Sequence, residues 1–373
     1  MVKFFCKKPI IINFLGAYQV NITVQKTTMP KAKPAEGTAL GFGKIFTDHM
    51  FVMDYSVSKG WHDAKIVPYG PIEVEPSCAV FHYGQAIFEG LKAYKTPSGD
   101  VLLFRPEKNM ERINISNDRL CIPQIDIPFC VKALKTFVDI EREWIPSGEG
   151  ASLYLRPFII ATDAVLGVHP SYTYKFFIIA SPSGQYYPEG VNPVRIWVEC
   201  KYVRAVKGGT GFAKTSGNYA SSLRAQKEAE DEGYTQVLWL DGIERKYIEE
   251  VGTMNVFFVI DGEVITPALQ GSILPGVTRM SAIELLNQQG KKVTERPITI
   301  TEIYKAHKEG KLSEVFGTGT AAVISPVGEL NYGGKKIIIN DNKTGPIAQK
   351  IYNELTQIQT GKAADKFGWT QRI

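Results

Sequence analysis

The sequence predicts a mixed α/β (α+β) protein of two domains. Extended runs rich in aromatic and β-branched residues alternate with amphipathic runs whose apolar positions recur every three or four residues. The chain has 373 residues, more than a single hydrophobic core usually accommodates. Hydrophobic residues at 44% and charged residues at 22% are ordinary for a folded protein, which excludes a disordered or collagen-like chain.

Local patterns place the expected elements in chain order. The expected strands are residues 45–55, 101–105, 152–162, 174–181, 195–200, 237–241, 255–261 and 313–325. The expected helices are residues 106–120, 128–145, 219–233, 274–290 and 345–361. Pro, Gly and Ser gather in residues 181–193, which is therefore the expected linker. We expect an N-terminal extension of uncertain role (1–40), a small α/β domain (41–185) and a large C-terminal domain (186–373).

Composition excludes several classes of protein. The excess of 43 basic over 38 acidic residues is too slight and too dispersed to indicate a nucleic-acid partner. Five cysteines, an odd number without a C-x-x-C pair, fit neither a disulfide framework nor a structural zinc site, so no metal is expected. No stretch approaches the roughly 20 apolar residues that span a bilayer. We therefore expect no membrane partner.

The first 35 residues contain lysines but no Asp or Glu. Three interpretations stay open. A transit peptide would be acid-poor, but this segment has no arginine, and a secretory signal would need a clear cleavage site of small residues. The third interpretation is an extended or misassigned start, with Met29 as the initiator. We expect a cytoplasmic protein, or a mitochondrial-matrix protein if the segment is a transit peptide.

Lys214 lies in the run GGTGFAKTSGNY, whose glycines allow the backbone to approach a ligand closely. Taken alone, it is most simply a solvated loop lysine. A phosphate-binding P-loop is nearly matched, but it fails at Ala213, where the pattern needs glycine. A third interpretation is a lysine that forms an imine with a carbonyl, as the pyridoxal-phosphate lysine does.

Two other motifs could complete such a site, which needs a carboxylate at the pyridine nitrogen and an anion site for the phosphate. Glu249 and Glu250 precede the expected strand 255–261. Adjacent residues in an extended chain face opposite ways, so only one should enter a site, and chemistry alone does not choose; both could be surface charges. In LPGVTRMSAIELL a Pro-Gly turn leads into a helix whose free N–H groups suit a phosphate. FGTGTAAVIS adds a turn with Thr318 and Thr320.

These motifs together resemble one family. FGKIFTDHM, HYGQAIFEGLKAY, FRPEKNMERI, SLYLRP, KYVRAVKGGTG, KTSGNYASSL, EEVGTMN, ILPGVTR and FGTGTAAV occur in the order found in branched-chain amino-acid aminotransferases. The resemblance covers roughly residues 40 to 370. It implies a two-domain, fold type IV, pyridoxal-phosphate enzyme with its active site at the domain interface, and a homodimer.

The resemblance implies specific contacts to the cofactor. Lys214 would hold pyridoxal 5′-phosphate and move the proton between the substrate α-carbon and the cofactor. The family's glutamate immediately precedes VGTMN, so Glu250 would pair with the pyridine nitrogen. Tyr219 would hydrogen-bond to the cofactor's 3′-oxygen. The residues implied at the phosphate are Arg112, the backbone N–H groups of Val277 and Thr278, and Thr320.

The implied reaction exchanges amino groups between leucine, isoleucine or valine and 2-oxoglutarate, giving branched-chain 2-oxo acids and L-glutamate. The family's aromatic pocket positions are matched by Phe42, Tyr83, Phe88, Tyr154 and Tyr186, each of which alone would be read as core packing. Arg156 resembles the arginine that accepts the glutamate side-chain carboxylate. Thr253 and Ala321 match the positions that bind the α-carboxylate.

Other functions remain as alternatives. D-amino-acid aminotransferases and aminodeoxychorismate lyases share the lysine and glutamate within fold type IV, but HYGQAIFEG, SLYLRP and KGGTG favour the branched-chain group. A phosphate-binding or nucleotide-binding module would explain the glycine-rich turns but not the aromatic set. We therefore expect amino acids and 2-oxo acids as the small-molecule partners.

Overall fold

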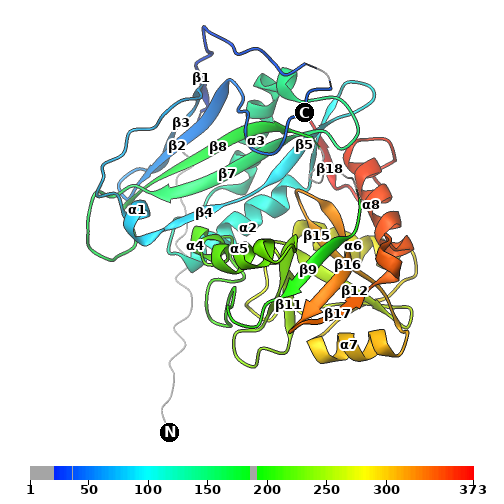
Figure 1. Ribbon diagram of the computed structural model, residues 1–373. Helices are drawn as coiled ribbons and strands as arrows, with labels where there is room; N and C mark the ends of the chain where they lie inside the picture. The colour runs from blue at the N-terminus through cyan, green and yellow to red at the C-terminus, as the bar shows by residue number, and fades with distance from the viewer. Residues whose placement is uncertain (1–20, 36, 185–190) are drawn as a thin grey trace.

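The computed structural model describes residues 21–35, 37–184 and 191–373. Within this part of the chain, strands and helices form two nine-stranded sheets with helices packed on them (Figure 1). The mixed α/β class predicted from the sequence is confirmed. Tyr186 and the first 20 residues lie outside the described part.

The first sheet has the strand order β1-β3-β2-β8-β7-β5-β6-β18, and β4 also pairs with β7. Its pairs are antiparallel except β1 with β3, which is parallel. The strands are β1 (Thr23–Val24), β2 (His49–Ser56), β3 (Gly60–Pro68), β4 (Ala86–Phe88), β5 (Leu91–Lys95), β6 (Val101–Phe104), β7 (Ser152–Ala161), β8 (Thr173–Ser183) and β18 (Thr370–Arg372).

Two long helices cover one face of this sheet. The helical elements here are α1 (Ala79–Tyr83), α2 (Pro106–Arg119), α3 (Ile127–Ile140) and the 3₁₀ turn η1 (Arg142–Trp144). The Asp126 side chain starts α3 by accepting the Phe129 N–H at 2.7 Å, and a proline occupies the first turn. The apolar stripe of α3, including Leu134 and Phe137, is fully buried in the core shared with α2 and the sheet.

The second sheet has the order β11-β10-β9-β16-β15-β12-β13-β14, with β17 on β16. Pairs β9–β10, β9–β16 and β13–β14 are parallel and the others are antiparallel. The strands are β9 (Val194–Val198), β10 (Gln236–Leu240), β11 (Ile248–Val251), β12 (Asn255–Ile260), β13 (Glu263–Thr266), β14 (Val293–Glu295), β15 (Leu312–Gly319), β16 (Val323–Tyr332) and β17 (Lys335–Ile338).

Helices cover both faces of the second sheet. They are α4 (Ser216–Ala220), α5 (Leu223–Asp231), α6 (Val277–Gln288), α7 (Ile300–Lys308), the 3₁₀ turn η2 (Asn340–Asn342) and α8 (Pro346–Gln359). Phe257 of β12 packs with α6 and α8, whereas its neighbour Phe258 packs with α7. This alternation explains why the run NVFFVI is apolar throughout, since both of its faces are buried.

Two expected elements are divided in the structure. The expected strand 313–325 is a hairpin, because residues 320–322 turn the chain from β15 into β16. The expected helix 219–233 is broken between α4 and α5. There the Ser221 and Ser222 hydroxyls donate to the carbonyls of Asn218 and Tyr219, at 3.1 and 2.7 Å, and so compete with continued helical bonding.

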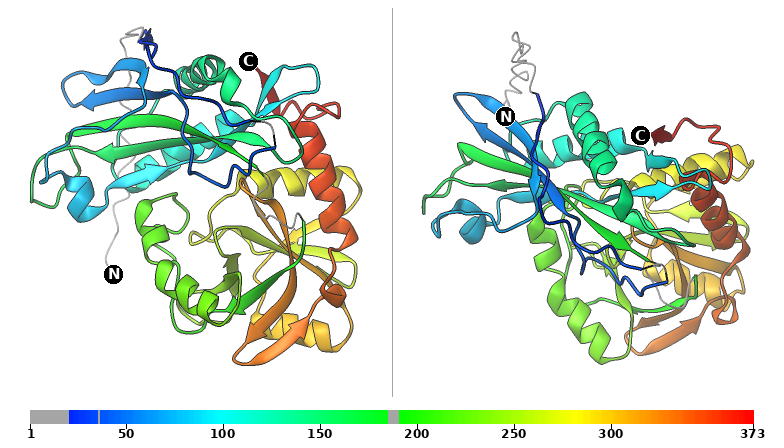
Figure 2. Two further views of the ribbon diagram at one scale, coloured as in Figure 1. Left: turned by 45° about the horizontal axis from the view of Figure 1, so that its top comes forward. Right: turned by 90° about the horizontal axis from the view of Figure 1, so that it is seen from above.

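The C-terminus links the two sheets. Helix α8 packs beside β15 and β16, and the chain then returns to the first sheet as β18, antiparallel to β6 (Figure 2). Trp369, just before β18, stacks on Phe367 and contacts Phe104 edge-on. Phe104 of the first sheet and Phe257 of the second belong to the same apolar core, which therefore joins the two sheets.

Candidate active site

The loop that carries Lys214 is tied by its backbone to the first sheet. The Lys214 N–H donates to the Ser116 hydroxyl on α2 at 2.9 Å, and the Lys214 carbonyl accepts the Phe88 N–H at 3.0 Å. Thr215 forms an isolated β-bridge with Ile87 of β4. Because the same loop follows β9 of the second sheet, Lys214 lies where the two sheets meet.

The remainder of the loop is fixed by close backbone packing. A Cβ added at Gly211 would lie 2.2 Å from the Ser272 carbonyl oxygen, so this approach requires glycine. The Asn218 amide nitrogen donates to the carbonyls of Thr210 and Ala213, both at 2.8 Å. The loop therefore holds its shape without using the Lys214 side chain.

The Lys214 amine faces two aromatic residues. Its Nζ donates to the Tyr219 hydroxyl at 2.7 Å and lies 4.8 Å from the centre of the Phe88 ring. The Phe88 and Tyr219 rings contact each other edge to face, with centroids 4.6 Å apart. The amine is thus placed at the boundary between an apolar cavity and a second group of polar residues that includes Glu250.

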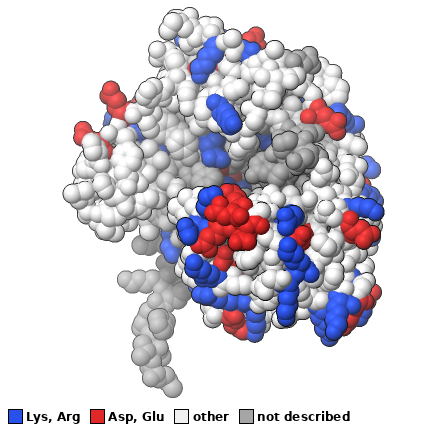
Figure 3. Space-filling view, in the orientation of Figure 1, with Lys and Arg blue, Asp and Glu red and all other residues white. Residues whose placement is uncertain are grey.

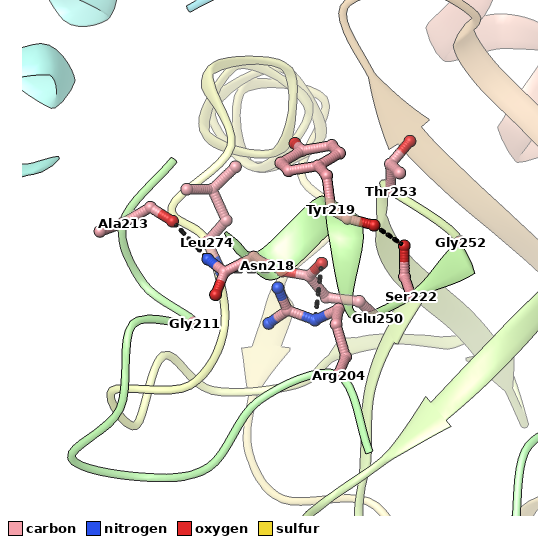
Figure 4. A pocket seen from close by; sticks show the side chains of 10 residues that line it. All are labelled: Arg204, Gly211, Ala213, Asn218, Tyr219, Ser222, Glu250, Gly252, Thr253 and Leu274. Atoms are coloured by element: carbon pink, nitrogen blue, oxygen red, sulfur yellow. Dashed lines mark hydrogen bonds and ion pairs between the residues drawn. The ribbon is translucent and has the colours of Figure 1, made fainter. Parts of the chain in front are cut away.

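The two adjacent glutamates face opposite sides of β11, as expected for extended chain. Glu250 is 3% exposed and accepts the Leu274 N–H at 2.8 Å, while the Arg204 Nε lies 3.4 Å from its other oxygen (Figure 4). Burial raises the pKa of the Glu250 carboxyl, against the opposing Arg204 charge. Glu249 instead accepts a hydrogen bond from the Ser272 hydroxyl and lines a different cavity. Glu250 alone enters the cavities beside Lys214.

The start of α6 forms the polar end of the site. Gly276 precedes the helix and no side chain caps it, so the N–H groups of Val277 and Thr278 face the cavity without a capping acceptor. The hydroxyls of Thr318 and Thr320 line the same small cavity, of about 40 Å³. Among the described residues, the buried Thr318 Oγ1 has no hydrogen-bond partner. These groups are the donors that an anion requires.

Arg112 lies on the same side and is held by a buried carboxylate. Its Nε and one terminal nitrogen donate to Glu89 at 2.6 and 2.9 Å, and the other terminal nitrogen donates to the Pro275 carbonyl at 3.0 Å. Asn109 and the Gly90 N–H also donate to Glu89, at 2.8 and 3.1 Å. A guanidinium carries five N–H donors, so Arg112 keeps two for a ligand.

The apolar side of the site is a cavity of about 150 Å³. Strand β7 contributes to it by alternation: Leu153 and Leu155 are buried in the core, while Tyr154 and Arg156 point to the other face. The sequence-predicted residues that line it are Phe42, Phe88, Tyr154, Arg156, Lys214, Tyr219, Thr253, Thr320 and Ala321. Residues from both sheets therefore build one cavity.

Arg156 brings a positive charge into this cavity without a carboxylate partner in the described part of the chain. A terminal nitrogen donates to the Tyr154 hydroxyl at 3.1 Å, and the buried Nε has no hydrogen-bond partner there. The guanidinium carbon lies 4.9 and 5.3 Å from the ring centres of Phe88 and Tyr154. These cation–π contacts partly offset the cost of burying the charge.

Tyr83 is not placed in the cavity. It lies on α1, is 43% exposed, and its hydroxyl donates to the Leu166 carbonyl in the loop between β7 and β8. The sequence could not separate it from the other aromatic positions, because exposure at the end of a sheet depends on the tertiary fold. Tyr186, the remaining predicted pocket residue, lies outside the described residues.

Several residues that shape the site were not predicted. Arg204 pairs with Glu250, and Glu89 pairs with Arg112. Arg204 lies in KYVRAVKGGTG and Glu89 in HYGQAIFEGLKAY, but neither residue was predicted to belong to the site. Others that line the cavities are Gly90, Gln236, Met254, Asn255 and Ala322. The signal that could have found Glu89 is an acidic residue inside IFEGLKAY, a stretch that is apolar apart from Glu89 and Lys92.

The residues present fit pyridoxal phosphate. The unpartnered Thr318 hydroxyl and the uncapped start of α6 suit its phosphate, and the buried Glu250 carboxylate suits its ring nitrogen. Lys214 stands near both groups. Within the described residues, no group of His, Cys, Asp and Glu side chains could hold a metal ion.

The molecular surface is hollowed between the two lobes, in the middle of the face shown in Figure 3. On this face acidic side chains gather just below the hollow and basic side chains are scattered around them. The face drawn therefore carries charges of both signs. Of the helices described, none combines the length and the apolar character needed to cross a bilayer.

Comparison with known proteins places the chain in a family. Residues 86–330 match the family described as Amino-transferase class IV. The chain is 60% identical over 352 residues to branched-chain-amino-acid aminotransferase 2 of Bacillus subtilis (strain 168), covering 94% of this chain and 97% of that protein. It resembles the crystal structure of the Escherichia coli branched-chain amino acid aminotransferase, with 28% identity, a TM-score of 0.74 and coverage of 87% of this chain and 98% of that one.

A second solved structure shares the fold and carries a ligand. It is the T.th. branched-chain amino acid aminotransferase complexed with N-(5′-phosphopyridoxyl)-L-glutamate, with 26% identity, a TM-score of 0.70 and coverage of 86% of this chain and 97% of that one. The family match and the high identity over nearly the full chain agree with the geometry of the site. The chain therefore belongs to the class IV aminotransferases and, within them, to the branched-chain-amino-acid aminotransferases.

Proposed function

We propose that this protein transfers the amino group between leucine, isoleucine or valine and 2-oxoglutarate, with pyridoxal 5′-phosphate as cofactor. The observation that carries the proposal is the position of Lys214. Its amine lies 2.7 Å from the Tyr219 hydroxyl, between the Glu250 and α6 side of the site and the aromatic cavity with Arg156. A single lysine at this junction can contact a cofactor on one side and a substrate on the other.

Different residues would bind different parts of the cofactor. When bound, pyridoxal phosphate supplies a carbonyl carbon that combines with amines and a conjugated ring that accepts an electron pair. Glu250 would accept a hydrogen bond from the ring nitrogen. The residues that would hold the phosphate are Arg112, Thr320 and the N–H groups of Val277 and Thr278.

Lys214 would also move the proton. Its Nζ would take the proton from the substrate α-carbon and return it to the cofactor side, a role open to this amine because Lys214 lines both cavities of the site. The Tyr219 hydroxyl, 2.7 Å away, accepts a hydrogen bond from this amine and so orients it. The Phe88 and Tyr219 rings cover part of the amine and so limit its contact with water.

The aromatic cavity explains how one site takes two kinds of substrate. Phe42, Phe88 and Tyr154 offer apolar surface to a branched side chain. Arg156, which lacks a carboxylate partner in the described residues, would pair with the side-chain carboxylate of glutamate or 2-oxoglutarate. Thr253 would bind the α-carboxylate that all of these substrates share.

We also propose that the protein is a homodimer. Large apolar side chains are exposed together on α1 and on the β7–β8 loop, which lie side by side at one end of the first sheet (Figure 1). Their exposed fractions are 61% for Phe81, 69% for Leu166, 82% for Val168 and 62% for Tyr172. An exposed apolar patch of this kind is typical of an interface. Tyr83 belongs to this patch. In the dimer, it would therefore contact the substrate pocket of the partner subunit.

The function is tested by trapping the cofactor and comparing substrates. Purified protein with pyridoxal phosphate should absorb visible light, and borohydride should attach the cofactor covalently to Lys214, as read by peptide mass spectrometry. Lys214→Ala should lose both the label and turnover. Lys207→Ala, an exposed lysine of the same loop, is the matched control and should keep both.

Substrate comparison then separates the activities within the family. L-leucine and L-valine should react with 2-oxoglutarate, whereas D-alanine and aminodeoxychorismate should not. Turnover confined to D-alanine, or to aminodeoxychorismate, would overturn the branched-chain assignment. A protein that neither binds the cofactor nor acquires the label at Lys214 would overturn the proposed site as well.

A further inference from the structure

One wall of the aromatic cavity comes from a loop near the N-terminal end of the chain. After β1 the dark blue segment crosses the first sheet and then re-enters that sheet as β2 (Figure 2). Residues 37–46 of this segment, here called the Phe42 loop, carry Phe42 to the cavity of about 150 Å³. The Phe42 ring contacts the Tyr154 ring edge-on, with centroids 4.8 Å apart. Because Phe42 is 39% exposed, it forms the outer wall of the cavity.

The backbone next to Phe42 does not fix this side chain by itself. Gly41 and Gly43 flank it with φ of +63° and +69°, in the left-handed region that glycine enters at little cost. Residues 41–44 are exposed and belong to no helix or strand. Such a segment keeps many conformations unless contacts elsewhere restrict it. The position of Phe42 therefore depends on how the ends of its loop are held.

The Asp48 carboxylate joins the two ends of the Phe42 loop. Asp48 lies directly before β2 and is 7% exposed. Its Oδ1 accepts the Lys31 N–H at 2.8 Å. Its Oδ2 accepts hydrogen bonds from Lys33 Nζ and Trp144 Nε1, both at 3.0 Å. Since Lys31 and Lys33 precede the loop and Asp48 follows it, one buried carboxylate closes the loop at its base.

The Lys31 side chain joins the same two ends a second time. Its ammonium donates to the carbonyls of Phe46 and Thr47, at 3.2 and 3.0 Å, and lies 4.8 Å from the centre of the Tyr69 ring. The Phe46 and Tyr69 rings stack on each other, with centroids 5.0 Å apart. The loop thus has the form of an Ω-loop, whose ends lie close together.

Asp48 is itself anchored to the end of α3. Glu141, which is 1% exposed, accepts the Asp48 N–H at 3.1 Å. Its other oxygen accepts the Nδ1–H of His49, because His49 Nε2 accepts the Thr27 N–H at 2.9 Å and so carries no proton. Burial would raise the pKa of Asp48, but the hydrogen bonds that it accepts and the Lys33 charge hold that pKa below its usual value. Asp48 is therefore a fixed, charged acceptor.

We propose that Asp48 is a positioning residue that holds Phe42 at the aromatic cavity and thereby favours branched-chain substrates. The proposal rests on the proposed function and deepens it. Asp48 does not line the cavity, so it acts through the loop. Without this carboxylate, Phe42 would have to be ordered each time a substrate binds, and the ordering would weaken binding. A branched side chain depends on the apolar wall, whereas glutamate has Arg156 as well, so leucine should lose more.

The test measures binding of a ligand that cannot react. 4-Methylvalerate, which has the side chain and carboxylate of leucine but no amino group, is titrated into each holoenzyme, and isothermal titration calorimetry gives Kd. In Asp48→Asn the amide nitrogen faces a donor that the carboxylate had accepted. Lys33→Met removes one donor only, and it decides the question if Asp48→Asn does not fold. Lys26→Met is the matched control, because the exposed Lys26 side chain makes no hydrogen bond or ion pair with the described residues.

Asp48→Asn should raise the Kd of 4-methylvalerate about fivefold and Lys33→Met about threefold, the order expected when one side chain must be ordered on binding. Lys26→Met should not change it. Phe42→Ala should raise the Kd as well, and adding Asp48→Asn to Phe42→Ala should cause no further loss, because the side chain that Asp48 positions is then absent. In steady-state kinetics, Asp48→Asn should raise KM for leucine more than KM for L-glutamate. The Kd of pyridoxal phosphate and kcat should stay close to wild type.

Two results would overturn the proposal. One is a Kd of 4-methylvalerate that is the same as wild type in Asp48→Asn, or in Lys33→Met if Asp48→Asn does not fold. The other is a loss of equal size with and without Phe42→Ala, which would show that Asp48 acts on the cavity by another route. Failure of the proposed function looks different, because wild type itself would then neither bind 4-methylvalerate nor transaminate leucine.

Discussion

We expect the buried ion pair between Glu89 and Arg112 to make the stability of the protein depend on its cofactor. Glu89 is fully buried and Arg112 is 5% exposed, and two hydrogen bonds of 2.6 and 2.9 Å join them. Burial alone would raise the pKa of Glu89, but the Arg112 charge and its hydrogen bonds outweigh burial and hold that pKa below its usual range. Glu89→Gln removes the negative charge, keeps the shape and leaves Arg112 buried with a neutral partner.

The expected loss follows from this burial. Removing one partner of a buried pair typically costs about 3–5 kcal/mol. Domains of 150–250 residues lose roughly 2–4 °C of Tm per kcal/mol, so apo Glu89→Gln should melt roughly 6–20 °C below apo wild type. In the holoenzyme the cofactor phosphate supplies a negative charge beside Arg112, so the loss should be clearly smaller. By linkage, the variant should bind pyridoxal phosphate more tightly than wild type does.

The assay is thermal unfolding of apo and holo forms, followed by circular dichroism. Asp231→Asn is the matched control, because Lys227 and Asp231 form a pair of 2.6 Å whose side chains are 63% and 62% exposed. An exposed pair contributes about 0–1 kcal/mol, so this control should melt close to wild type in both forms. Equal losses of Tm in apo and holo Glu89→Gln would refute the reasoning, because the phosphate would then not share the Arg112 charge.

Three further predictions concern the substrate cavity and the apolar patch. Arg156→Ala should raise KM for L-glutamate about 10- to 100-fold, the value of a charged hydrogen bond, and change KM for L-leucine much less; equal changes would contradict the role of Arg156. Gly90→Ala would place a Cβ 2.0 Å from the Tyr154 hydroxyl, so Tyr154 must move, and KM for leucine should rise with little change in Tm. Leu166→Asp should shift the protein from dimer to monomer in light scattering, and an unchanged mass would exclude this patch as the interface.

Most of the fold was predictable because its signals are local. The alternation along β7 and the spacing of apolar residues in α3 depend only on which face of each element is buried. The sequence indicates a turn within FGTGTAAVIS, but the positive φ of Val323 was not predictable in this way, because valine is a strong strand former and its surroundings hold this conformation. Strand β18 has only three residues, and its pairing with β6 depends on where the chain lies after the end of α8.

Local patterns predicted some residues of the site, but not the contacts between elements that are distant in the sequence. Period-two alternation predicted that one of Glu249 and Glu250 enters the site, and the structure places Glu250 there. Which of the two enters depends on the register of β11 against β10, where Glu250 pairs with Trp239. Contacts such as Lys92 with Ala321, which are distant in the sequence, leave no local pattern. Charged contacts between different elements could therefore be identified only from the structure.

The charges around the cavity account for the two kinds of substrate. Arg112 is matched by Glu89 and Arg204 by Glu250, whereas Arg156 and Lys92 have no carboxylate partner in the described chain. Of these two cations, Arg156 lines the aromatic cavity, where it would pair with the side-chain carboxylate of glutamate or 2-oxoglutarate. Leucine brings only one carboxylate, so Arg156 must stay unpaired beside an apolar side chain. Its cation–π contacts with two aromatic rings lessen the free-energy cost of that state, which helps one cavity to accept both substrates.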